Sequence, residues 1–427
     1  MVKKVKGAAP KRKYRGIPDR DRISITLARF SPLAHGLPMT PISDLADRYK
    51  RDPSVISRAI KDAFEDGLVE VVEVQRRAPE PKRVHTLERQ LQERYWKLLT
   101  VIVVEPPYMP EPEAGPEALA QWDDDVHRSL GEALARSFTT GITPFRNGEA
   151  IGFGSGRGVY SVVAALRFHP PLRVEEIKLM SLTGSLLPSN HARMLNAALD
   201  ADFHVSLFGL SIEGVVHSQM AIHAITSKDD QQLASWRGLT CLDEARWERQ
   251  KPTHALMGAG VLGPGHRMYE AAQPDRMAAE EDTVLGPILR RDANGQSGVL
   301  ARLVDLCREA SQPDQRYYAV GDVCNHLFFV PPKGGATSQR EAIEKLTTAI
   351  NQKLLNVTRK QLGEIDHVIL CAGTTKKAWT IHQLLCGEME SADPALPKTR
   401  IRTLCTDSAT AQELLGFPMP KPKAQQG

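Results

Sequence analysis

Two short amphipathic helices and a strand are predicted near the start of the chain. Over residues 41–50, apolar positions recur every three or four residues, which predicts a helix. A second stripe with the same period predicts a helix over residues 53–66, after a turn at Asp52 that can cap it. Gly67 ends this helix, and the apolar run over residues 68–74 predicts a strand. Helix, turn, helix and strand in this order are typical of a winged helix-turn-helix.

The exposed side chains near the start of the second helix are of the types that contact DNA. In a helix-turn-helix, the N-terminal residues of the second helix reach the base edges in the major groove. Hydroxyl, guanidinium and ammonium groups can bond bases or phosphates. The predicted DNA-binding residues are Ser54, Ser57, Arg58 and Lys61 of the helix, with Arg76 and Arg77 of the wing. The alternative is a helical hairpin used for protein contacts.

A further amphipathic helix is predicted after the wing, from residue 84 onward. It has a single apolar stripe, which must be buried against a partner. The helix either pairs with a second copy of the chain or docks on its own C-terminal part. We expect a linker helix over residues 84–104, between a DNA-binding domain at residues 31–80 and a C-terminal domain at residues 105–420.

Helices and strands alternate in the C-terminal part. Strands are predicted at the apolar runs over residues 149–153, 177–182, 204–210, 254–257 and 367–371. Runs that are apolar throughout are typical of parallel strands covered on both faces. The pattern therefore predicts an α/β, Rossmann-like domain with its ligand over the carboxyl ends of the strands.

Glycines and polar residues follow several of these strands. Glycine lets the backbone approach a ligand, and a helix N-terminus attracts an anion. We predict a site for a polyhydroxylated or phosphorylated effector made by Gly154, Ser155, Gly156, Arg157, Gly184, Ser185, Asp322, Thr374 and Lys377. The first glycine turn lacks the lysine and hydroxyl ending of a P-loop and has no acidic partner for a dinucleotide, so no nucleotide cofactor is expected.

The amino-acid composition adds one feature to the predicted domains, a basic segment at the N-terminus. The chain has 427 residues, 41% of them hydrophobic, and a net charge of +4, which is ordinary for a globular protein. Basic residues crowd the first two dozen positions, so we expect a basic arm over residues 1–30, in part disordered, beside the DNA-binding domain. A solubilising tail is the alternative. The chain shows no apolar segment suited to a secretory signal or a membrane span.

The six cysteines are scattered, without a CxxC pair or a Cys/His cluster of metal-binding spacing. Neither a metal site nor a cofactor is therefore expected. Most of the cysteines lie in apolar runs, where cysteine acts as a small hydrophobe, and the cytoplasm is the compartment that we expect.

A series of short motifs runs through the chain in a characteristic order. They lie at residues 52–58, 65–69, 87–91, 151–156, 319–324, 372–377 and 406–411. The series resembles the SorC family of sugar-responsive bacterial transcription regulators. The resemblance implies a sugar-phosphate-isomerase-like effector domain, an inducer that is usually a phosphorylated sugar, and a dimeric or tetrameric repressor or activator. It also implies that Gly154 and Gly156 line a phosphate turn, that Lys377 meets an anionic group and that Asp322 meets sugar hydroxyls.

The chain departs from the family pattern at several places. Gly158 stands where the family usually has threonine, and Ser185 and Thr374 stand where it usually has glycine. The segment over residues 262–316 is also longer than the family's. The missing hydroxyl at Gly158 leaves open whether the effector is phosphorylated.

Taken together, these patterns predict a transcription regulator that binds a double-stranded DNA operator and a sugar or sugar-phosphate effector. We expect it to form a homodimer or homotetramer, to have no catalytic residues and to have no membrane partner. One alternative is an isomerase- or deaminase-like enzyme with an accessory DNA-binding domain, in which Asp322, His326 and Lys377 would move protons. The fused DNA-binding unit argues against it. A second alternative is a DNA-binding scaffold whose pocket binds nothing.

Overall fold

The computed structural model divides the chain into two compact units, Met1–Arg77 and Ala78–Gly427. The structure describes residues 2–4, 17–30, 40–65, 69–71, 80–106, 108, 115–141, 145–183, 201–219, 230–274, 285–289, 297–312, 317–333, 338–389, 393–394 and 396–419.

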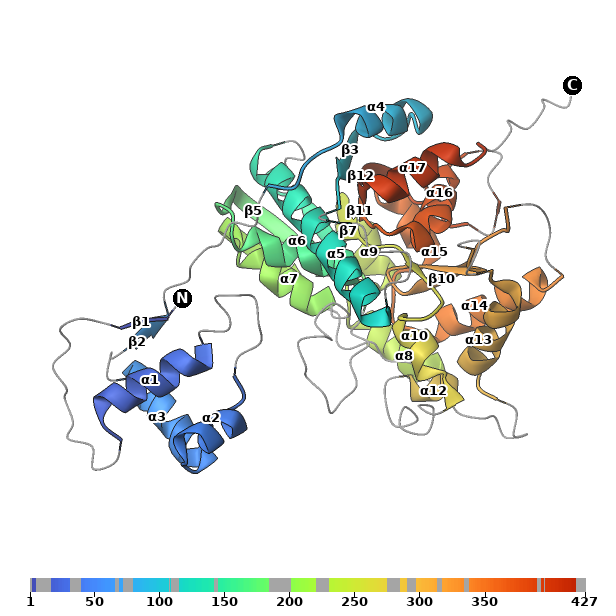
Figure 1. Ribbon diagram of the computed structural model, residues 1–427. Helices are drawn as coiled ribbons and strands as arrows, with labels where there is room; N and C mark the ends of the chain where they lie inside the picture. The colour runs from blue at the N-terminus through green and yellow to red at the C-terminus, as the bar shows by residue number, and fades with distance from the viewer. Residues whose placement is uncertain are drawn as a thin grey trace, which may run out of the picture. The chain divides into compact units, whose positions relative to one another are not determined.

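The N-terminal unit combines three helices with a two-stranded sheet (blue in Figure 1). Its elements are β1 (Val2–Lys4), α1 (Asp19–Phe30), α2 (Ile42–Tyr49), α3 (Pro53–Glu65) and β2 (Val69–Val71). All three helices contribute to a common core, in which Ile25, Leu45 and Ile56 are buried. Strand β1 pairs antiparallel with β2. The helix, turn, helix and strand that the hydrophobic pattern predicts are all present.

Part of the predicted N-terminal arm belongs to this core. The arm was expected over residues 1–30, but Asp19–Phe30 forms helix α1 and packs against α3. Ile25 is 1% exposed and Arg22 is 2% exposed, so this part of the segment is folded. The basic composition of the segment hid the few apolar positions that dock it. Residues 5–16 lie outside the described residues.

The C-terminal unit is built on a seven-stranded sheet in the order β3-β12-β11-β7-β4-β5-β6. The strands are β3 (Thr100–Val104), β4 (Ala150–Phe153), β5 (Leu172–Ser181), β6 (Ile212–Gln219), β7 (His254–Met257), β11 (His367–Cys371) and β12 (Ile401–Asp407). Every neighbouring pair is parallel. The predicted α/β fold with a parallel sheet is therefore confirmed.

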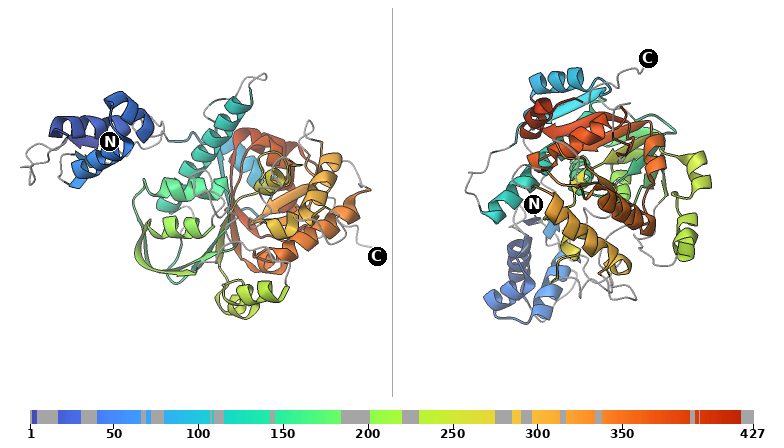
Figure 2. Two further views of the ribbon diagram at one scale, coloured as in Figure 1. Left: turned by 90° about the horizontal axis from the view of Figure 1, so that it is seen from below. Right: turned by 90° about the vertical axis from the view of Figure 1, so that its right-hand side faces the viewer.

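Helices cover both faces of this sheet (Figures 1 and 2). One face carries α5 (Pro116–Thr139), α6 (Arg157–Leu166) and α7 (Ala201–Gly209), and the other carries α4 (His85–Arg94), α16 (Ala378–Cys386) and α17 (Ser408–Gly416). Successive side chains of a strand point to opposite faces, so Val368 and Ile369 of β11 enter different cores. Both faces being apolar explains why these strands read as unbroken hydrophobic runs.

A small antiparallel sheet stands beyond the carboxyl end of β7. It has the order β10-β9-β8 and consists of β8 (Gly260–Val261), β9 (Val320–Val323) and β10 (His326–Phe329). Cys324 and Asn325, both with positive φ, form the two-residue turn between β9 and β10. The remaining elements are α8 (Asp230–Gly238), α9 (Glu244–Gln250), α10 (Arg267–Ala271), α12 (Gly286–Leu289), α13 (Val299–Ala310), α14 (Arg340–Lys353), α15 (Arg359–Glu364) and the 3₁₀ turn η4 (Thr375–Lys377).

Two of the predicted elements differ from the structure. The segment over residues 204–210 was expected as a strand, but all of it except residue 210 belongs to helix α7. An apolar run of this length fits either element, and only its neighbours decide between them. The helix expected over residues 84–104 ends at Arg94, and Thr100–Val104 form the edge strand β3. Helix α4 packs on α17 of its own unit, so this segment is part of the sheet domain rather than a linker. Within the described ranges, no helix is long and apolar enough to cross a bilayer.

Candidate functional site

The strand order reverses between β4 and β7, which are neighbours at the middle of the sheet. From β4 the chain continues outward through β5 and β6, and from β7 it continues through β11 and β12 in the other direction. The loops that leave β4 and β7 therefore diverge, and such a point is where open parallel sheets bind ligands. A cavity of about 120 Å³, here called the strand-end cavity, opens there. Its lining is Ser155, Gly156, Arg157, Gly158, Gly258, Ala259, Gly260, Val261, Pro264, Gly265, His266, Arg267, Asp322, Asn325, Cys371, Lys376 and Lys377.

Cationic side chains gather on one wall of this cavity around the carboxylate of Asp123. Arg157 is ion-paired with Asp123, and Lys376 Nζ lies 4.0 Å from the same carboxylate oxygen. Burial alone would raise the pKa of Asp123, but the surrounding cations, Lys377 first, hold it below its ordinary value. Three cations from two strand ends thus face Asp123, and Arg157 also donates to Asp124 Oδ1 at 3.3 Å. Three cations against these two carboxylates leave an excess of positive charge on this wall, which suits an anionic ligand.

The ammonium group of Lys377 is buried on this wall. His127 Nδ1 lies 2.6 Å from the Asp123 backbone carbonyl and donates to it, so its Nε2 is left to accept from Lys377 Nζ at 3.3 Å. Burial, helped by the neighbouring lysine charge, lowers the pKa of His127 to about 3, so the ring is neutral. Burial also lowers the pKa of Lys377 to about 8, against the attraction of Asp123. A bound anion would stabilise the charged form of this lysine.

The opposite wall carries the small antiparallel sheet. His266 Nε2 lies 3.6 Å from Asp322 Oδ2, and Gly260 is close enough to Asp322 that a Cβ there would lie 3.0 Å from the same oxygen. His266 Nδ1 and Asp322 Oδ1 are buried and make no hydrogen bond to the residues that the structure describes. Buried polar atoms are normally bonded, so this wall offers a donor or acceptor pair to a hydroxylated ligand.

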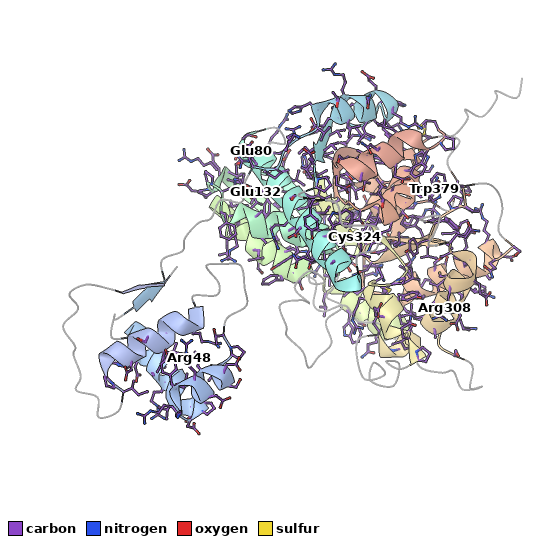
Figure 3. The ribbon with its side chains drawn as sticks, in the orientation of Figure 1. Arg48, Glu80, Glu132, Arg308, Cys324 and Trp379 are labelled. Atoms are coloured by element: carbon purple, nitrogen blue, oxygen red, sulfur yellow. The ribbon has the colours of Figure 1, made fainter. Side chains whose placement is uncertain are left out.

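Asn325 ties the hairpin to the main sheet. Its Nδ2 donates to Thr183 Oγ1 at 2.8 Å, and its Oδ1 accepts from Ser155 Oγ at 3.2 Å. The hairpin turn is buried with Asn325 5% exposed, and Figure 3 shows the neighbouring Cys324 in the interior of the C-terminal unit. The three side chains come from three separate loops. They hold the loop after β4, the loop after β5 and the hairpin in one arrangement.

Two glycines shape the loop between β4 and α6. Gly156, at the N-cap of α6, has φ 122°, a conformation that L side chains rarely adopt. A Cβ on Gly158 would lie 2.1 Å from the backbone oxygen of Cys371. The threonine that the SorC pattern has at this position therefore does not fit the spacing between α6 and β11 in this chain. The departure at Gly158 reflects close backbone packing.

The structure brings five of the nine predicted effector residues together. Those that line the strand-end cavity are Ser155, Gly156, Arg157, Asp322 and Lys377. Gly154 packs under the hairpin instead, where a Cβ would lie 2.6 Å from Cys324 Sγ. Thr374 is 3% exposed, has φ 73° and donates its backbone N–H to Asp407 Oδ2 at 2.7 Å, so it shapes the turn before Lys377. Gly184 and Ser185 lie outside the described residues.

The predicted DNA-binding residues of α3 share one face. Ser54, Ser57, Arg58 and Lys61 are all exposed, at helical spacing. The opposite face, with Ile56, Ala59, Ile60 and Ala63, is buried. Arg76 and Arg77 lie outside the described residues.

Several contributors to the site were not among the predicted effector residues. They are Asp123, His127, His266, Asn325 and Lys376. Asp123 and His127 stand four residues apart on α5, beside the buried Val126 and Leu130, and polar residues in an apolar stripe are a signal that can be read. His326, which the enzyme alternative placed with Asp322 and Lys377, does not line this cavity.

Comparison with known proteins gives structural likenesses only. No family model matches the chain, and no curated protein matches its sequence. The chain is similar to the full-length sorbitol operon regulator SorC from Klebsiella pneumoniae, at 16% identity and a TM-score of 0.46, over 93% of this chain and 99% of that one. It is similar to a DeoR family transcriptional regulator from Listeria monocytogenes, at 13% identity and a TM-score of 0.49, over 77% and 98%.

An enzyme is also among the similar structures. The 6-phosphogluconolactonase from Plasmodium vivax has 10% identity and a TM-score of 0.31, over 68% of this chain and 90% of that one. All three TM-scores are below 0.5.

Proposed function

We propose that the protein is a transcription regulator in which a helix-turn-helix unit binds operator DNA and a small anionic, sugar-like effector in the strand-end cavity modulates that binding. The observation that carries the proposal is the pairing, in one chain, of an exposed polar face on α3 with a cationic cavity at the switch point of a parallel sheet. The resemblance to the SorC family supports it.

The face of α3 is suited to the major groove. Two hydroxyls and two cations project from one side of the helix, while the other side is buried against α1 and α2. Asp52 Oδ1 accepts from the backbone N–H of Ser54 at 2.8 Å and caps the helix at the end that would meet the bases. A helix fixed in this way can present Arg58 to a guanine edge or a phosphate at low entropic cost.

The strand-end cavity is suited to an anion that also carries hydroxyl groups. Lys377, Lys376 and Arg157 offer positive charge, and the N-terminus of α6 opens onto the same space. Asp322 and His266 offer hydrogen bonds on the opposite wall. A sugar phosphate or a sugar acid fits both walls.

Assembly as a dimer or tetramer is part of the proposal, because paired operator half-sites require two helix-turn-helix units at a fixed separation. The effector would act by changing that separation. A reaction is the second possibility, since Asp322 and His266 lie 3.6 Å apart in the same cavity as Lys377 and could move protons.

The test is a gel-shift titration of the full chain against the DNA upstream of its own gene, at fixed salt. We expect specific, salt-sensitive binding that Arg58→Ala weakens by about 1–3 kcal/mol. Arg173→Ala is the matched control, because Arg173 is an exposed arginine of the C-terminal unit paired only with Glu213 among the described contacts. Sugar phosphates and sugar acids are then added to the complex. The assignment of α3 would be contradicted if Arg58→Ala and Arg173→Ala lost the same amount of DNA affinity, or if neither lost any. Absence of any binding at low salt would favour the enzyme, to be tested by isomerase assays.

A further inference from the structure

A second and larger cavity lies on the far side of the β9–β10 hairpin. Its volume is about 490 Å³, and it is called here the α14 cavity, after the helix that forms one wall. Strand β10 and α14 lie side by side in the C-terminal unit (Figure 1). The lining is Arg237, His326, Leu327, Phe328, Phe329, Glu344, Thr347, Thr348, Asn351, Gln352, Asn356, Thr358 and Arg359. None of these residues lines the strand-end cavity.

The charged groups of this cavity are unbalanced in favour of cations. The lining holds two arginines, Arg237 and Arg359, and one carboxylate, Glu344, which is already bonded to Arg340 Nε at 2.7 Å. Burial lowers the pKa of Arg237 against the attraction of Glu244, and it lowers the pKa of Arg359 against the attraction of Asp393 and Glu344. An anion entering the cavity would supply the missing charge.

Two buried nitrogen atoms of the lining have unused hydrogen-bonding capacity. Arg237 Nη2 donates to the Leu354 carbonyl at 3.3 Å, but Nη1 is buried and makes no hydrogen bond within the described part of the chain. The same holds for Nδ1 of His326, a side chain 8% exposed. Burial, helped by the charge of Arg359, lowers the pKa of His326 to about 4 against the attraction of Asp322, so the ring is neutral. Buried polar atoms in this condition mark places that a ligand can satisfy.

The rest of the lining combines an apolar floor with amides and hydroxyls. Leu327, Phe328 and Phe329 of β10 form the apolar part, and threonine, asparagine and glutamine side chains of α14 and the following loop form the polar part. Ligand pockets for small polar molecules have this composition, in which apolar contacts give area and a few polar groups give orientation. The volume lies within the usual range of about 300–1,000 Å³ for such pockets.

We propose that the α14 cavity is a second ligand site, which binds a small hydroxylated organic anion, a sugar acid or a sugar phosphate, independently of the strand-end cavity. Arg237 binds the anionic group, and His326, Asn351 and Thr348 face its hydroxyls. The proposal does not depend on DNA binding or on which effector occupies the strand-end cavity.

The two sites are joined by the hairpin. Asp322 of the strand-end cavity pairs in register with Leu327 of the α14 cavity. The Asn325 backbone oxygen accepts from Asn356 Nδ2 at 3.0 Å, while the Asn325 side chain bonds Ser155 and Thr183. The hairpin therefore forms part of the wall of each cavity, with Asp322 and Asn325 lining the strand-end cavity and residues 326–329 lining the α14 cavity.

The experiment is calorimetric titration of the full-length Lys377→Met protein, in which the strand-end cavity has lost its buried cation. The probes are gluconate, glucuronate and glucose 6-phosphate, with neutral glucose as the uncharged analogue. We expect at least one of the anions to bind and glucose not to bind. Adding Arg237→Met should weaken that binding by about 10- to 100-fold, the loss expected for a charge-assisted hydrogen bond.

A second variant guards against a folding defect in Arg237→Met. Thr348 is exposed at the rim on α14, so Thr348→Trp should fill the cavity without removing a buried contact, and it should abolish binding. Ala342→Trp, at an exposed position of the same helix outside the lining, is the matched control and should leave affinity unchanged. If no anion binds the Lys377→Met protein, or if binding survives Thr348→Trp, the second site is refuted. The gel-shift result is unaffected by either outcome, so the two proposals fail separately.

Discussion

Replacing Lys377 by methionine should remove a pH-dependent part of the protein's stability. Burial lowers the pKa of Lys377 from 10.5 to about 8, and the nearby Asp123 carboxylate only partly opposes this. The unfolded chain keeps the proton on this lysine up to about pH 10, whereas the folded chain loses it near pH 8. Between these values the unfolded state binds more protons, so the free energy of unfolding rises with pH.

The size of the effect follows from the shift. About 2.5 pKa units at 1.36 kcal/mol each correspond to about 3 kcal/mol, because Lys377 is buried and little screened by solvent. Below about pH 8 this amount is a constant cost of keeping the ammonium charged inside the fold. Methionine has a similar length and no charge, so the variant should lack both the cost and the rise.

Urea titrations followed by tryptophan fluorescence would measure this, since all five tryptophans lie in the C-terminal unit. Wild type and Lys377→Met are compared at pH 7 and near pH 10, and the difference between the two proteins cancels the other groups that titrate in this range. The wild type should gain up to about 3 kcal/mol more than the variant over this interval. Equal pH dependence in the two proteins would refute the burial of a charged lysine at this site. A bound anion should lose affinity for the wild type above about pH 8, as the ammonium is neutralised.

Two further substitutions test the packing of the site. Gly158→Ala should destabilise the C-terminal unit by roughly 1–3 kcal/mol in the same titration, because its Cβ would lie 2.1 Å from the Cys371 carbonyl oxygen. Gly115→Ala, where a Cβ meets nothing within 4 Å, should leave the midpoint in place, and a stable Gly158→Ala protein would show that α6 and β11 can separate. Asn325→Ala should cost roughly 2 kcal/mol or more, because it removes the bonds to Ser155 and Thr183 and leaves a side chain at φ 59°. Asn325→Gly should recover only the backbone part of this loss, and full recovery would mean that the two hydrogen bonds contribute nothing.

The secondary structure followed largely from local patterns. The stripes of α2 and α3 and the unbroken apolar runs of β4, β7 and β11 were each found at the expected positions, because burial on one helix face or on both sheet faces dictates those periods. The failures also have local causes. An apolar run of seven residues fits either a strand or a helix, which is why α7 was misassigned. The apolar stripe of α4 indicated that one face of this helix is buried, but it did not indicate which element covers that face. The structure shows that α4 packs on α17.

The candidate site also has a part that could be predicted from the sequence and a part that could not. Glycines after β4 and the lysine after β11 were visible because strand ends in a parallel sheet meet at one edge. The residues that contact this lysine, Lys377, could not be predicted from the sequence. Lys377 and His127 are 250 residues apart along the chain, and nothing in either neighbourhood indicates the other. The same is true of Asn325, whose two partners, Ser155 and Thr183, lie 170 and 142 residues away.

The sequence by itself determined the two kinds of unit, the parallel sheet and the residue types at its strand ends, because hydrophobic period and turn chemistry act over a few residues. The tertiary structure alone decided which of those residues meet. The strand order places β4 beside β7, α5 brings Asp123 and His127 to the end of β11, and the hairpin separates two cavities instead of closing one. Contacts between distant segments depend on how whole elements pack, and that information is spread over the entire core rather than held in any one motif.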